Sequence, residues 1–102
     1  MKLEFSPYVA IQVSDHPQAV EFYKNVLGMD FVDAKGNDAY LNKDGVNFVF
    51  EDNSEGRGSV FFEFKTDNLA EARKELEAAG CVVTQEYNEH SAMFSDPFGM
   101  NF

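Results

Sequence analysis

The sequence predicts an α+β fold built from two copies of one unit, each in the order strand, helix, strand, strand, strand. Two observations lead to this expectation. The tetrapeptide Gly-x-Asn-Phe occurs at residues 45–48 and returns at 99–102. A helical pattern that starts with Asp and ends with Gly also occurs twice with equal spacing, at 15–28 and 67–80. Such repeats indicate one supersecondary unit built twice, with the copies burying each other.

The first copy is expected at about residues 7–52. Apolar residues alternate with others at 9–13, which is typical of a half-buried strand. Asp15 can cap the helix that follows, Pro17 fits its first turn, and Gly28 can end it in a left-handed conformation. Turn-forming residues then separate three expected strands, around residues 30–33, 39–42 and 46–51.

The second copy is expected at about residues 59–102, after a polar, glycine-rich linker at 53–58. Asp67 or Asn68 can cap its helix, and Asn68 has Glu71 at the capping-box spacing. The run 96–99, Asp-Pro-Phe-Gly, has the residue order of a type I turn. The expected strands lie at 59–64, 81–86, 92–95 and 100–102.

Composition limits the possible functions. The 102 residues suffice for one domain with one shared core. The formal charge of −10, with scattered Lys and Arg, argues against binding to nucleic acid. No run approaches the roughly 18 apolar residues of a membrane span, so no membrane partner is expected. The single cysteine, Cys81, favours a reducing cytoplasm and is expected to be buried.

The doubled unit resembles the vicinal oxygen chelate superfamily, which contains glyoxalases, bleomycin-resistance proteins and extradiol dioxygenases. The resemblance covers nearly the whole chain. It rests on the pattern from Val13 through His16-Pro17 to Leu27-Gly28 and on the Asp-Pro-Phe-Gly run near the end. The matching residues are Val13, Asp15, Ala19, Phe22, Tyr23, Leu27, Gly28, Ala79, Gly80, Asp96, Pro97 and Gly99.

The resemblance implies an open, curled mixed sheet with the helices outside and a cavity on the concave face. It also implies a homodimer. With this arrangement, Val9, Ile11 and Val13 should pack under the first helix, and Val60, Phe62 and Phe64 under the second. The alternate residues of the first strand of each copy should then face the cavity. Five phenylalanines are assigned to the core: Phe22, Phe48, Phe50, Phe62 and Phe64.

The residues argue against the metal site that many members of this superfamily use. The resemblance places the metal ligands at Tyr8, Val49 and Ser59, where His or Glu would be needed. His16 stands beside a helix cap and is expected to be exposed. We therefore expect no metal and no cofactor, which disfavours glyoxalase and dioxygenase activity.

The favoured hypothesis is a metal-free protein that binds a small molecule, with a cationic or aromatic, drug-like ligand. Aromatic walls with sparse polar groups are typical of ligand pockets, and acidic groups beside rings favour cations. Two alternatives stay open: an enzyme of the same superfamily, lyase or dioxygenase-like, using Glu51 or Glu63 as base, and a ligand-free structural domain. The expected ligand-binding residues are Tyr8, Gln12, Tyr40, Asn47, Glu51, Ser59, Phe61, Glu63 and His90, with Phe94 as a further aromatic candidate.

Overall fold

Seven of the eight predicted strands and both helices form in the predicted order, in a computed structural model that describes all residues 1–102. Both helices have ten residues, and neither is long and apolar enough to cross a membrane. The elements are β1 (Glu4–Val13), α1 (His16–Asn25), β2 (Asp30–Lys35), β3 (Asp38–Lys43), β4 (Val46–Asp52), β5 (Val60–Lys65), α2 (Leu69–Ala78), β6 (Val82–Asn88) and β7 (Ser91–Ser95).

The strands form a mixed sheet of the order β2-β3-β4-β1-β5 and a separate pair, β6-β7. In the larger sheet β1 and β4 are parallel, whereas β2, β3 and β4 form antiparallel neighbours. The predicted α+β class is confirmed. The chain divides into two compact units, which we describe separately. The central unit is Pro7–Phe61, and the terminal unit combines Met1–Ser6 with Phe62–Phe102.

Helix α1 begins as the sequence predicts. The Asp15 carboxylate accepts a hydrogen bond from the Gln18 backbone N–H at 3.5 Å, and a proline lies in the first turn. Asp15 itself has φ of 50°, a left-handed conformation that is costly for a residue with a side chain. After the helix, Gly28 has φ of 71°, which glycine adopts without that cost. The chain can therefore turn directly into β2.

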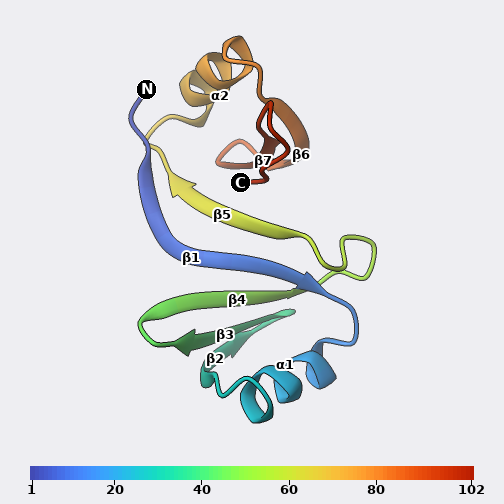
Figure 1. The fold of residues 1–102 in the computed structure, drawn as a ribbon. Helices are drawn as coiled ribbons and strands as arrows, with labels where there is room; N and C mark the ends of the chain where they lie inside the picture. Colours follow the sequence, from blue (N-terminus) through green and yellow to red (C-terminus); the bar gives the residue numbers. More distant parts are fainter. The chain divides into compact units, whose positions relative to one another are not determined.

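The core of the central unit lies between α1 and one face of the sheet, and Figure 1 shows α1 beside β2, β3 and β4. Phe50 of β4 has no exposed surface and is the largest fully buried side chain. Ile11 and Val13 of β1 pack into the same cluster as Val20 of α1, so the predicted orientation of β1 is confirmed. Phe48 packs against this cluster too, but Phe22 is 49% exposed, and its assignment to the core was wrong.

His16 is not the exposed residue that the sequence predicted. Its side chain is half-buried, and its Nε2 lies 3.2 Å from the backbone carbonyl oxygen of Phe50. The imidazole can donate a hydrogen bond to that oxygen and so link the start of α1 to β4.

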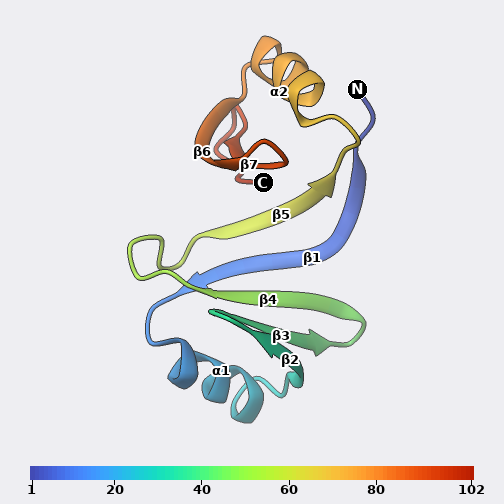
Figure 2. The same ribbon diagram turned by 180° about the vertical axis from the view of Figure 1, so that it is seen from behind.

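The terminal unit contains α2 and the β6-β7 pair, which Figure 2 shows side by side. Asn68 caps α2 by accepting a hydrogen bond from the Glu71 backbone N–H at 3.0 Å. The run after β7 forms the predicted turn, in which Gly99 N–H donates to the Asp96 carbonyl at 3.2 Å.

The last segment of the chain does not form the strand expected at 100–102. It makes one bridge, between Asn101 and Ser95, and backbone hydrogen bonds with Phe94, Asp96 and Phe62. Phe94 is buried and stacks on Phe102 with ring centroids 5.7 Å apart, so it is a core residue of this unit.

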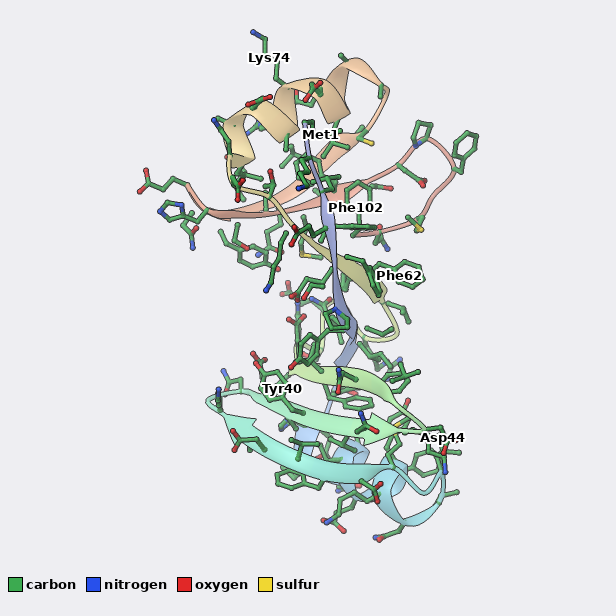
Figure 3. All side chains as sticks on the ribbon, turned by 90° about the vertical axis from the view of Figure 1, so that its left-hand side faces the viewer. Met1, Tyr40, Asp44, Phe62, Lys74 and Phe102 are labelled. Atoms are coloured by element: carbon green, nitrogen blue, oxygen red, sulfur yellow. The ribbon has the colours of Figure 1, made fainter.

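The predicted burial of β5 was wrong. Phe62 and Phe64 are each 39% exposed, and Val60 is exposed as well. The rings of Phe62 and Phe64 contact Phe5 at centroid distances of 6.4 and 5.7 Å, and each ring stays partly open to solvent. Figure 3 labels Phe62, whose ring projects sideways from β5. The same pattern of alternating apolar residues therefore led to a buried face in β1 and to a partly exposed one in β5.

Candidate functional site

The site is the face of the central unit's sheet that points away from α1. Side chains alternate between the two faces of a strand, and residues directly opposite one another share a face. The strand register therefore arranges this face in three rows that run across β2, β3, β4 and β1. We call them the charged row (Lys35, Asp38, Glu51, Gln12), the middle row (Asp33, Tyr40, Val49, Ala10) and the amide row (Asp30, Asn42, Asn47, Tyr8).

Two residues of the middle row form a buried apolar patch, and two tyrosines share its sheet face. Ala10 and Val49 are opposite each other and both are buried. Tyr8 and Tyr40, which are half-buried, meet edge to face with centroids 6.0 Å apart and an interplanar angle of 80°. Figure 3 shows Tyr40 projecting from β3 on this side of the sheet. Flat aromatic surface beside small aliphatic side chains suits a planar ligand.

A hydrogen bond fixes the amide row. The Asn42 side-chain amide donates to the Asn47 side-chain oxygen at 3.0 Å, between two residues that oppose each other in the register. Asn47 is in turn opposite Tyr8 in the parallel pair of β1 and β4. The row therefore offers amide groups of defined orientation beside the tyrosine pair.

The charged row contains a buried amide next to a carboxylate. Gln12 is only 5% exposed, and its Nε2 donates to Glu51 Oε1 at 3.4 Å. Glu51 is half-buried and lies opposite Asp38 on its other side. Because an amide N–H that donates to a carboxylate restricts its rotation, Gln12 positions Glu51 on the face.

The segment 53–59 folds over Gln12. The Gln12 backbone donates to the Ser59 carbonyl and accepts from Gly58 N–H, each at 2.9 Å. A Cβ atom added to Gly56 would lie 1.7 Å from Gln12 Oε1, far inside van der Waals contact. Only glycine therefore fits at residue 56 with the Gln12 amide in its present place.

The structure brings most of the predicted site residues together. Tyr8, Gln12, Tyr40, Asn47 and Glu51 all lie on the three rows. A backbone hydrogen bond connects Ser59 to Gln12. Phe61, two residues further along, is buried in the same unit.

Glu63 and His90 belong to the terminal unit. Glu63 is exposed and accepts a hydrogen bond from the buried Ser6 hydroxyl at 2.8 Å. His90 follows β6 in an exposed turn, where its Nε2 lies 3.2 Å from the Glu89 carboxylate. The Cys81 thiol, expected to be buried, is half-buried.

Sequence reasoning missed five residues of this face, Asp30, Asp33, Lys35, Asp38 and Asn42, and the neighbouring Gly56. The five lie on β2 and β3, and their face follows from the β2-β3-β4 register. The Lys-Gly-Asn-Asp turn at 35–38 could have indicated that Lys35 and Asp38 pair across a hairpin. The role of Gly56 had no local signal, because it depends on contact with a residue of β1.

The residues present do not fit the metal site of the metal-dependent relatives. The candidate ligand positions carry Tyr8, Val49 and Ser59, and a valine side chain has no donor atom. No group of three His, Cys, Asp or Glu side chains in the structure is arranged to hold a metal ion. The two histidines make other contacts, with the Phe50 carbonyl and with Glu89.

Comparison with known proteins identifies the family. Residues 6–102 match the model of the Glyoxalase/Bleomycin resistance protein/Dioxygenase superfamily. A member of that superfamily from Vibrio splendidus 12B01 has a similar structure, with a TM-score of 0.66 and 19% identity over 99% of this chain and 96% of that one. The antibiotic binding protein TnmS3 from Streptomyces sp. CB03234 is 22% identical over 99% of this chain and 93% of that one, with a TM-score of only 0.46. A search of curated proteins found no match.

Proposed function

Because the chain belongs to the glyoxalase/bleomycin resistance protein/dioxygenase superfamily, we propose that it binds a small molecule without the help of a metal ion. The ligand would lie on the face formed by the three rows. One observation carries the proposal: the edge-to-face pair of Tyr8 and Tyr40 shares one sheet face with the buried Ala10 and Val49 and with the acidic residue Glu51. This combination supplies apolar contact and charge on one sheet face.

The proposed ligand is a planar or cationic organic molecule. The quadrupole of a tyrosine ring attracts a cation at its face, and this attraction contributes about 0.5–2 kcal/mol. In the charged row, Asp38 and Glu51 are opposite each other, and both share the sheet face of Tyr40. The formal charge of −10 adds a long-range attraction for cations and repels anions.

Other parts of the proposal rest on the sequence pattern. We propose that the central unit supplies most ligand contacts, from Tyr8, Gln12, Tyr40, Asn47 and Glu51, with Ser59 and Phe61 at its β5 side. Glu63 and His90 remain candidates from the terminal unit. We also propose that residues 7–52 and 59–102 are tandem copies of one module, and that the protein acts as a cytoplasmic homodimer.

A ligand screen tests the binding function. Chelator-treated protein would be screened by thermal shift with planar ammonium compounds and neutral aromatic compounds, and any hit would be incubated to measure turnover. Tyr40→Leu should weaken binding of a hit on the order of tenfold, since about 1.4 kcal/mol corresponds to a factor of ten. Tyr87→Leu removes an exposed tyrosine of the terminal unit and is the matched control.

Two results would contradict the proposal. Equal affinity of Tyr40→Leu and the unsubstituted protein for the ligand would show that the tyrosine pair is not part of the binding site. Binding that disappears after chelation and returns with nickel, zinc or manganese would show a metal-dependent site. Turnover of a bound compound would instead identify an enzyme, and Glu51→Gln would then test whether its carboxylate acts as the base.

A further inference from the structure

We propose that Lys35 is a tethered competitor of the ligand: its ammonium group occupies the Tyr40 ring and must leave before a cation can bind there. The inference rests on the proposed function, because it concerns the selectivity of that same face. The role assigned to Lys35 is to lower the affinity of the face for cationic ligands.

The first argument is the position of the ammonium group. Lys35 Nζ lies over the Tyr40 ring, 5.8 Å from its centroid, within the distance of a cation–π interaction. Tyr40 is also the ring that meets Tyr8. A cation of the protein's own therefore already occupies the surface on which a cationic ligand would be bound.

The second argument is the strand register. Lys35 ends β2 and is directly opposite Asp38, which is directly opposite Glu51. Like charges directly opposite each other in a sheet are unfavourable, and a nearby cation reduces that cost. Lys35 is the basic member of the row, so its ammonium group has both the ring and the carboxylates within its reach.

The third argument is that Lys35 can be displaced easily. Its side chain is exposed, at the edge strand of the sheet and next to a two-residue turn. An exposed cation–π contact contributes about 0.5–1 kcal/mol, so a ligand that binds the Tyr40 ring more strongly can displace the Lys35 ammonium group. The apparent affinity of the ligand falls by the fraction of molecules in which the ring is open.

Displacement also sets selectivity. Once moved aside, the ammonium group of Lys35 stays near the site and repels a cationic ligand, but it does not repel a neutral one. Removing its charge should therefore strengthen binding of a cation much more than binding of a neutral molecule with the same shape.

The test uses two probes of the same shape, 4-(trimethylammonio)phenol and 4-tert-butylphenol, titrated by NMR into the full chain. Lys35→Met should tighten binding of the ammonium probe by about three- to tenfold and of the neutral probe by a smaller factor, because both gain an open ring but only the cation is also freed from charge repulsion. Lys35→Arg keeps the cation and should leave both affinities nearly unchanged. Lys24→Met is the matched control, since Lys24 Nζ lies 5.7 Å from the centroid of Phe31, outside the three rows.

The possible results separate this inference from the proposed function. If the ammonium probe binds the Tyr8–Tyr40 face equally well in Lys35→Met and Lys24→Met, the role of Lys35 is refuted and the binding function stands. If neither probe perturbs Tyr8 or Tyr40 in any variant, both are refuted. A ligand-free measurement gives a further check: the Lys35 Hε signals should move downfield in Tyr40→Leu, and unchanged signals would contradict the ring contact.

Discussion

The two units of the molecule bury very different numbers of apolar side chains, although each contains one ten-residue helix. In the central unit, Leu41 and Phe50 are almost completely inaccessible to solvent. In the terminal unit, the buried apolar residues are Ala72 and Phe94, while Phe62 and Phe64 stay partly exposed. The difference shows that alternation of apolar residues creates a face but does not by itself bury it.

The fourth strand of the central unit explains much of the difference. β4 pairs with β1 over residues 47–52 and with β3 over residues 46–51. The segment with the same Gly-x-Asn-Phe sequence, 99–102, forms no strand; it makes one bridge, to Ser95, and backbone hydrogen bonds with Phe94, Asp96 and Phe62. A strand with neighbours on both sides presents its side chains inside a continuous sheet, where a helix can cover them.

The candidate site lies on the better-packed unit. The tyrosine pair, the Gln12–Glu51 hydrogen bond and the Gly56 contact are all inside Pro7–Phe61. Side chains held by a packed sheet keep their geometry before the ligand arrives, which reduces the ordering cost of binding. The contrast between the units can be tested by substitutions in each.

The largest difference is expected for a large-to-small substitution in each unit. Phe50→Ala should lower the free energy of unfolding by about 3–5 kcal/mol, since it removes a fully buried ring and leaves a cavity. Phe64→Ala should lower it by only about 1–2 kcal/mol, since that ring is already partly hydrated. Urea unfolding measures both, and Phe50→Leu replaces Phe50→Ala if the latter does not fold. Equal losses for the two alanine variants would refute the contrast.

A smaller effect is expected where the 53–59 segment covers Gln12. Gly56→Ala should cost about 1–3 kcal/mol, because the new Cβ displaces the buried amide from Glu51. Gln12→Ala should remove most of this cost, which a double-mutant cycle would show as a coupling of at least about 1 kcal/mol. Gly58→Ala is the control, since a Cβ there meets no atom within 4 Å and only its φ of 87° is unfavourable. Additive losses for Gly56→Ala and Gln12→Ala would disprove the contact.

The smallest effect concerns the two helix caps. Asn68→Ala should cost about 1 kcal/mol, because Asn68 has an extended backbone and a 3.0 Å hydrogen bond to the Glu71 N–H. Asp15→Gly should change stability by less than about 0.5 kcal/mol, since the lost 3.5 Å cap is offset by relief of the left-handed φ. Thermal unfolding compares the two variants. A larger loss for Asp15→Gly than for Asn68→Ala would mean that α1 depends on its cap more than α2 does.

The sequence predicted the elements well and their burial less well. Caps, turns and alternation are local signals, so the amino-acid order alone was enough to locate the helices after Asp15 and Asn68 and the turn at Asp96. The exposure of Phe22, Phe62 and Phe64 depends on what covers them, which is a non-local property. The pattern was correct for β1 because α1 covers that strand's apolar face.

The same distinction holds for the site. Period-two alternation was enough to place Tyr8 and Gln12 on one face, and the doubled Gly-x-Asn-Phe run located Asn47 and Glu51. The turn at 35–38 indicates that Lys35 and Asp38 pair, but their place on the site's face required the β2-β3-β4 register. Gly56 required knowledge of a contact between two segments far apart in the sequence.

The most direct test of the proposed binding face is to locate a bound ammonium ligand by NMR. With 4-(trimethylammonio)phenol at saturation, intermolecular nuclear Overhauser effects between its methyl protons and the rings of Tyr8 and Tyr40 are the expected result. These effects should disappear in Tyr40→Leu and persist in Tyr87→Leu. Saturable binding with contacts confined to residues outside the three rows would contradict the account.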